Sequence, residues 1–328
     1  MAHDLITEVG MINQLKIDVE TLAAPGTRKI GTQGHKAAME HLRSRMGESG
    51  LIPYQGDSFL LPYEVESTQY TNLAGVLPGL DRGLNPILLV AHYDTCGDQP
   101  GADDNAAAIA IWLGVLENLK HQTAQRDIIF LFPDAEEPPR FLSEHMGSTN
   151  FYKTQRQGPI HAGLVLDLVG HDVPLAGMEE LLFIFGAESH MSMADLLLEV
   201  DPPPGLKNIA TLNRYVGDLS DHHILREEGQ PYLFFTCGRW EHYHQESDTP
   251  EHLNYDKMEK VGRYLSKMIK HLDQVEIDLS ASQSDPVEME LQLLKRAIGP
   301  YLEHKGIKME NRDDVQQFVL NWIRDYHL

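Results

Sequence analysis

Cysteine is scarce in this chain of 328 residues, which contains only Cys96 and Cys237. Two cysteines are too few for a disulfide framework, so the fold depends on a buried core. Long apolar runs are also missing, since even the stretch at 181–185 is far too short to cross a bilayer. The first residues lack the basic and then apolar pattern of a signal peptide. Together these absences predict a cytoplasmic protein.

Basic residues are in short supply too. The chain has 27 Lys and Arg against 49 Asp and Glu, which gives a formal net charge of −22. A chain this acidic repels nucleic acid and anionic membrane surfaces, so we expect neither as a partner. No glycine-rich phosphate-binding loop is present, which argues against a nucleotide-dependent enzyme.

What the sequence does contain is 42% hydrophobic residues, enough for one large core. Short apolar runs, typical of strands buried on both faces, alternate with longer helical segments. Strands are predicted at 72–76, 86–91, 127–132, 162–169, 181–185 and 231–236. Helices are predicted at 4–22, 33–48, 104–119, 144–153, 190–198 and 256–272. This alternation predicts an α/β fold of three αβα layers, with helices on both faces of a mostly parallel central sheet.

The chain changes character after residue 273. Residues 274–286 are polar and acidic, as in a linker, and residues 287–328 form a predicted C-terminal helical extension. Its last helix, with Asp313 placed to cap it, carries one apolar stripe made of Val315, Phe318, Val319, Trp322, Ile323 and Tyr326. Such a stripe either docks on the chain's own domain or joins two copies into a homo-oligomer. The sequence leaves both alternatives open.

Acidic residues and histidines follow four of the predicted strands. In chain order they are His92 and Asp94, Asp103 and Asp104, Glu136 and Glu137, Asp167, and His244. Taken singly, each has an ordinary explanation, such as a solvated histidine, surface glutamates or a helix cap. Ligands in α/β folds bind beyond the carboxyl ends of the strands, so four such groups together predict one shared site.

Side chains of these types suit zinc, which accepts imidazole nitrogen and carboxylate oxygen together. Two histidines and three carboxylates would hold two zinc ions if one carboxylate bridges them. Two ions about 3.5–4 Å apart can share a hydroxide and polarise a carbonyl. A further carboxylate must take the proton from water and give it to the leaving amine. Two adjacent glutamates provide one metal ligand and one proton carrier.

Five ordered motifs in residues 25–272 resemble metallopeptidase family 28, which includes leucyl aminopeptidases, a glutamate carboxypeptidase and glutaminyl cyclases. The motifs are His92-Tyr93-Asp94, Pro100-Gly101-Ala102-Asp103-Asp104-Asn105, Glu136-Glu137 followed by Met146-Gly147-Ser148, Asp167-Leu168-Val169-Gly170, and His244 with Asp248-Thr249. The tail after residue 274 lies outside the resemblance. Residues 1–273 are therefore expected to be a zinc exopeptidase catalytic domain.

The resemblance implies two Zn²⁺ ions per chain and assigns a role to each residue. One ion would be held by His92, Asp103 and Asp167, and the other by Asp103, Glu137 and His244. Asp103 would bridge the ions, and Glu136 would act as general base and then as general acid. Asp94 would fix the tautomer of His92 through its second ring nitrogen. The resemblance also implies a cis peptide between Asp103 and Asp104, and an aminopeptidase that acts on peptides with a free N-terminus.

Three departures from the family pattern leave the preferred side chain open. Pro138-Pro139-Arg140 follows the second glutamate, Ala106-Ala107-Ala108 replaces a usual Ser-Gly pair, and Gln245 replaces a common threonine. A glutaminyl cyclase-like acyltransferase with one zinc is an alternative within the family. A dimeric deacylase or carboxypeptidase would need a large inserted lid, which the 76 residues between Asp167 and His244 do not provide. A non-catalytic binding homologue should have lost a ligand, and none is missing.

Overall fold

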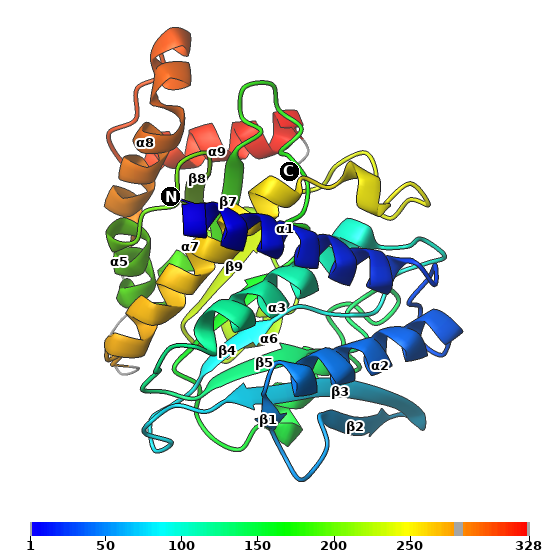
Figure 1. The fold of residues 1–328 in the computed structure, drawn as a ribbon. Coiled ribbons are helices and arrows are strands. Elements are labelled where there is room, and N and C mark those ends of the chain that lie inside the picture. Colours follow the sequence, from blue (N-terminus) through cyan, green and yellow to red (C-terminus); the bar gives the residue numbers. More distant parts are fainter. Residues whose placement is uncertain (1, 279–284, 327–328) are drawn as a thin grey trace.

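One mixed β-sheet runs through the computed structural model, which describes residues 2–278 and 285–326. Its strands are β1 (Ile52–Pro53), β2 (Leu60–Val65), β3 (Thr68–Leu77), β4 (Ile87–Val90), β5 (Ile128–Phe132), β6 (Ala162–Leu166), β7 (Leu181–Phe185), β8 (Lys207–Thr211) and β9 (Tyr232–Thr236). The strand order is β1-β3-β5-β4-β6-β9-β7-β8, and β2 pairs with β3 (Figure 1).

Parallel strands form the centre of the sheet. β5, β4, β6 and β9 are mutually parallel neighbours, whereas β3 joins β5 and β7 joins β9 in antiparallel pairs. Every residue of β4, β5, β6 and β9 is buried, as expected of strands covered on both faces. The three-layer prediction is confirmed, and the antiparallel pairings at both sides make the whole sheet mixed.

Helices cover both faces of the sheet. They are α1 (Ala2–Ala23), α2 (Gln33–Glu48), α3 (Ala108–Leu119), α4 (Gly147–Asn150), α5 (Met191–Glu199), α6 (His222–Glu227), α7 (Tyr255–Gln274), α8 (Val287–Lys305) and α9 (Arg312–Tyr326). Helices α1, α3 and α7 pack against one another on the face that Figure 1 shows in front, and α6 contacts β6 and β9 from the other face. α3 is almost entirely apolar and lies in the middle of this packing, where Trp112 donates a hydrogen bond of 2.9 Å to the carbonyl of Val90.

Three short strands were not predicted as separate elements. β1, β2 and β8 all fall in segments for which the sequence predicts no strand. β8 begins with the polar pair Lys207-Asn208, which hides it from an apolar pattern. The buried amide of Asn208 donates to the hydroxyl of Tyr264 at 2.8 Å, so its polarity is satisfied inside the protein.

The two C-terminal helices pack on the far edge of the sheet, beside β7 and β8 (Figure 1). Met289 and Leu293 of α8 and Val315 and Trp322 of α9 belong to the same hydrophobic core as the sheet. The apolar stripe of the last helix therefore docks on its own chain, and a homo-oligomer through these helices stays a prediction. Residues 279–284 of the predicted linker lie outside the described residues.

None of the helices in the described part of the chain is both long and apolar enough to cross a membrane. The cytoplasmic location expected from the sequence stays a prediction.

Candidate metal centre

Side chains from three neighbouring strand ends meet at one point of the sheet edge. His92 follows β4, Glu136 follows β5 and Asp167 follows β6. One ligand atom from each of these three residues lies within 4.8 Å of the other two. All three side chains are buried, so this group of nitrogen and oxygen atoms is shielded from bulk water.

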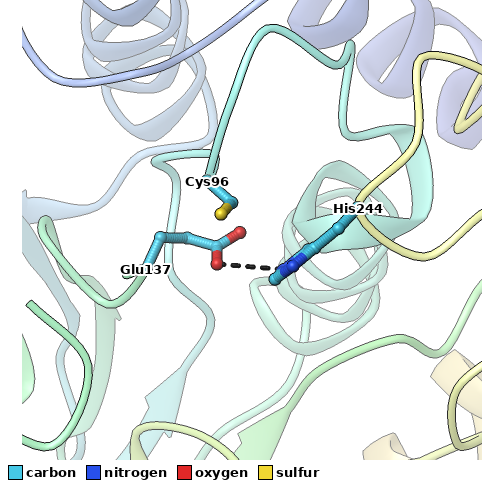
Figure 2. Close-up of side chains that lie close together, drawn as sticks. All are labelled: Cys96, Glu137 and His244. Atoms are coloured by element: carbon cyan, nitrogen blue, oxygen red, sulfur yellow. Dashed lines mark ion pairs between the residues drawn. The ribbon is translucent and has the colours of Figure 1, made fainter. Parts of the chain in front are cut away.

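A second cluster lies beside the first. It contains Glu137, His244 and the thiol of Cys96, whose ligand atoms are also within 4.8 Å of one another. Figure 2 shows the sulfur beside the Glu137 carboxylate, with the imidazole of His244 on the other side at 3.1 Å from Oε2. The loop after β9 brings His244 to this position. The structure thus gathers four of the five residues expected to bind metal, and their role as ligands stays a prediction.

Asp104, and not Asp103, is the carboxylate between the two clusters. Its Oδ1 lies 3.5 Å from Nε2 of His92, and its Oδ2 lies 3.2 Å from Nε2 of His244. One oxygen thus faces each histidine, which is the arrangement that a bridging carboxylate needs.

The sequence-based placement of Asp103 as the bridge is therefore wrong by one residue. Both Asp103 oxygens point away from the cluster, where Oδ1 accepts from the Gly170 amide at 2.7 Å and Oδ2 lies 2.6 Å from Nδ1 of His171. The cis peptide is displaced by the same step, since it joins Asp104 and Asn105. Adjacent carboxylates at the first turn of a helix point in different directions. Composition alone does not tell which of the two faces the site.

Asp94 and Asp248 hold the two halves of the centre through the backbone. The carboxylate of Asp94 accepts from the amides of Glu136 and Glu137 at 3.1 and 3.2 Å, and Oδ1 lies 3.5 Å from Nδ1 of His92. Nδ1 of His92 has no hydrogen-bond partner among the described residues, so the fixing of the His92 tautomer by Asp94 stays a prediction. Asp248 accepts from the amides of Asp103 and Asp104 at 2.8 and 3.1 Å. Each acid therefore positions a proposed ligand without facing the metal itself.

Arg28 is a buried support that no sequence pattern indicates. Its guanidinium is 0% exposed and donates to the carbonyls of Tyr93 and Gly101 at 2.8 and 2.9 Å. It also donates to the carbonyl of Pro100, so one side chain ties together both ends of the loop that leads from His92 to Asp104. The residue precedes the first predicted site motif by more than sixty positions, and no local pattern marks it.

The donor atoms and charges of this centre fit a zinc site. Nε2 of His92, Oδ1 of Asp167 and Oε1 of Glu137 are buried and have no hydrogen-bond partner among the described residues. Burial, followed by repulsion from Asp104, raises the pKa of Glu137 to about 8. Burial also raises the pKa of Glu136 well above its ordinary value, with the neighbouring Asp167 and Glu137 adding to the effect and His92 opposing it. Buried carboxylate oxygens without a hydrogen-bond partner are costly, and a bound dication would compensate this cost.

The centre opens into a cavity of about 390 Å³. Asp104, Glu136, Glu137 and Asp167 line one end of it. The remaining walls are mostly apolar and include Phe141, Leu168, Phe183, Phe185, Ile209, Val216, Leu219, Phe234, Tyr243, Val319, Trp322 and Ile323. A concave apolar pocket with a few polar groups at one end is the usual form of a small-ligand site.

Comparisons with known proteins show which family the chain matches. The chain matches the model of peptidase family M28 over residues 72–269. It is 29% identical over 194 residues to the putative endoplasmic reticulum metallopeptidase 1-A of Caenorhabditis elegans, a match that covers 57% of this chain and 20% of that protein. It is also 26% identical over 205 residues to the uncharacterized protein YfbL of Escherichia coli (strain K12), covering 53% of this chain and 63% of that protein. The chain therefore matches less than two thirds of the length of both relatives.

Solved structures show the same fold. Porphyromonas gingivalis glutaminyl cyclase superposes with a TM-score of 0.65 at 16% identity, covering 79% of this chain and 98% of that chain. A leucine aminopeptidase precursor from Bacteroides thetaiotaomicron superposes with a TM-score of 0.63 at 18% identity, covering 79% and 96% of the two chains. The family match spans more than half of the chain and includes the whole cluster of carboxylates and histidines described above, so this protein belongs to peptidase family M28.

Proposed function

We propose that this chain is a two-zinc aminopeptidase that hydrolyses the first peptide bond of peptides with a free N-terminus. The position of Asp104 carries the proposal, because its two oxygens face His92 and His244 separately. One ion would be held by His92, Asp104 and Asp167, and the other by Asp104, Glu137 and His244. A site for one ion would not need a carboxylate placed between two histidines.

Zinc supplies Lewis acidity and lowers the pKa of bound water, so that hydroxide forms near neutral pH. The protein's own part is to move the proton and to hold the reacting groups. Glu136 reaches within 3.8 Å of Nε2 of His92 and lines the cavity, where it would accept a proton from water and pass it to the leaving amine. Its raised pKa suits a group that must both accept and donate a proton.

A requirement for a free N-terminus follows from the charges around the cavity. Four carboxylates line the part of the cavity at the metal centre, which favours the binding of an α-ammonium group near the scissile bond. An N-acetylated peptide would lose this attraction and would place an uncharged amide among the acids.

The test is turnover of a peptide panel, free and N-acetylated, by protein stripped with a chelator and then reloaded with zinc. Zinc-dependent release from the free peptides alone supports the proposal. N-terminal glutaminyl peptides belong in the panel because glutaminyl cyclases share the fold. Cyclisation of these peptides together with one zinc per chain would replace the aminopeptidase by an acyltransferase. A Glu136→Gln variant with parental turnover would refute the catalytic assignment and favour a binding homologue.

A further inference from the structure

We infer that helix α9 is a wall of the substrate pocket, and that this wall limits the pocket to one bulky uncharged side chain next to the scissile bond. The inference rests on the proposed function for the reaction, but it concerns a segment of the chain that the family match does not include. The match ends at residue 269, whereas α9 begins at Arg312.

Three residues of α9 line the cavity that holds the metal centre: Val319, Trp322 and Ile323. They face Phe183 of β7 and Ile209 of β8, which line the same cavity. The indole of Trp322 meets the ring of Phe183 edge-on, with 6.0 Å between the ring centres. A segment far away in sequence from the metal centre therefore forms part of the cavity wall.

The cavity-lining residues of α9 are packed into the protein and are not exposed on its surface. Val319 and Trp322 are only 3% and 6% exposed. Phe318 packs on the indole from within the same helix at 5.5 Å between ring centres. A side chain held by such contacts on two sides defines a fixed pocket boundary.

Partly buried ion pairs fix the start of the helix. Arg312, the first residue of α9, pairs with Asp285 and with Glu290 of α8. Glu290 is 0% exposed and accepts a hydrogen bond of 2.8 Å from Thr211, the last residue of β8. Thr211 itself lines the cavity. The contacts from β8 through α8 to α9 thus fix the position of α9 relative to the sheet.

The lining chemistry defines the class of side chain that fits. Apart from the four acids at the metal end, the only charged residue among the described lining residues is Arg239. Arg239 is exposed and lies over the ring of Tyr243 at 5.1 Å, so its charge stays at the rim. The interior offers no partner to a charged substrate side chain, whereas aromatic rings and branched aliphatic groups bury well there.

The test compares two variants of neighbouring residues on α9. Val319→Trp adds a large ring inside the pocket, and Leu320→Trp adds the same ring on the outer side of the helix, where Leu320 is 42% exposed. The measurement is kcat/KM for alanyl, leucyl and phenylalanyl p-nitroanilides. A change of one methylene in an apolar pocket shifts kcat/KM by about 10–200-fold. We therefore expect Val319→Trp to lower the Phe/Ala and Leu/Ala ratios at least about tenfold, and Leu320→Trp to keep the parental ratios.

A second variant and a second readout protect the test against misfolding and against failure of the proposed reaction. Trp322→Ala enlarges the pocket, so it should raise the preference for a naphthylalanyl over a leucyl substrate. Calorimetric binding of free L-phenylalanine and L-alanine to the zinc-loaded parent and to both tryptophan variants measures the pocket without turnover. Loss of L-phenylalanine binding in Val319→Trp alone supports the wall even if no p-nitroanilide is cleaved, in which case only the proposed function fails. Equal selectivity and equal L-phenylalanine binding in the two tryptophan variants would overturn the inference.

Discussion

Replacing Asp103 and Asp104 separately by alanine should give opposite patterns of stability, because these adjacent carboxylates face different surroundings. Asp103 lies in a fully buried hydrogen-bonded pair with the Gly170 amide and His171. Asp104 faces His92 and His244 in the metal centre. Comparing the two variants tests directly whether Asp104, and not the sequence-based choice Asp103, is the bridging residue.

The cost of Asp103→Ala comes from the two donors that it leaves behind. Both oxygens of the carboxylate accept hydrogen bonds at 2.7 and 2.6 Å, and the residue is 0% exposed. A hydrogen bond to a charged group contributes about 1.5–3 kcal/mol, and breaking a buried pair costs about 3–5 kcal/mol. We expect the free energy of unfolding to fall by about 3–5 kcal/mol, with and without zinc. The variant should still be stabilised by adding zinc.

Asp104→Ala should behave in the reverse way. Without metal, removing this acid relieves repulsion on Glu137 and Asp167, while His244 keeps its contact with Glu137. These effects offset each other, so we expect the free energy of unfolding without metal to change by less than about 1 kcal/mol, as it does for substitutions without a dominant mechanism. In the parent, zinc at a thousandfold excess over its Kd adds about 4 kcal/mol to the free energy of unfolding, and the variant should lack this gain.

Urea unfolding of both variants, in chelator and in buffered zinc, measures these quantities, and elemental analysis gives the zinc content. The assignment of Asp104 as the bridge fails if Asp104→Ala retains two zinc ions and the zinc-dependent gain. Loss of zinc by Asp103→Ala alone would restore the sequence-based assignment.

Three further predictions concern other parts of the site and of the fold. Glu136→Gln should lower kcat by about 10²–10⁴-fold with unchanged zinc content, because general acid–base catalysis contributes that much; equal turnover or equal zinc loss would contradict it. Arg28→Met should cost roughly 3 kcal/mol or more in urea unfolding, because buried carbonyls lose charged hydrogen bonds; a change within error would show that the loop needs no such support. Burial opposes the charge of Asp218, but hydrogen bonds from His223 and Arg226 outweigh it and lower the pKa of this carboxyl. Asp218→Asn should therefore be less stable than the parent at pH 7, and the gap should narrow steadily as the pH falls from the ordinary carboxyl pKa of 3.8 toward the lowered pKa of the folded state; a gap of constant size from about pH 5 down to about pH 2 would contradict the charged pair.

The convergence of the site could be predicted from the sequence because it follows from sheet geometry. Strands buried on both faces are recognisable as apolar runs, and parallel neighbours end at the same edge of the sheet. That is why His92, Glu136, Glu137, Asp167 and His244 were expected together and are found together. Whether they bind metal stays a prediction, but their meeting point was set by the order of strands and not by any motif alone.

What could not be predicted depends on directions and distances that no local pattern encodes. Asp103 and Asp104 are chemically identical, and only the contact of Asp103 with Gly170 and His171 decides which carboxylate faces the centre. Arg28 supports the loop from His92 to Asp104 through backbone carbonyls, which have the same chemistry in every residue.

The last helix illustrates the same limit most clearly. Its apolar stripe predicted that one face is buried, and that face is buried in the structure. A stripe carries no information about the surface that covers it, and the packed core and a pocket wall require the same residue types. Trp322 serves both purposes, since its ring contacts Phe318 of its own helix and the residue also lines the cavity of the metal centre. A substitution that shrinks this side chain should thus change both stability and selectivity, whereas adding a ring at Leu320 should change neither.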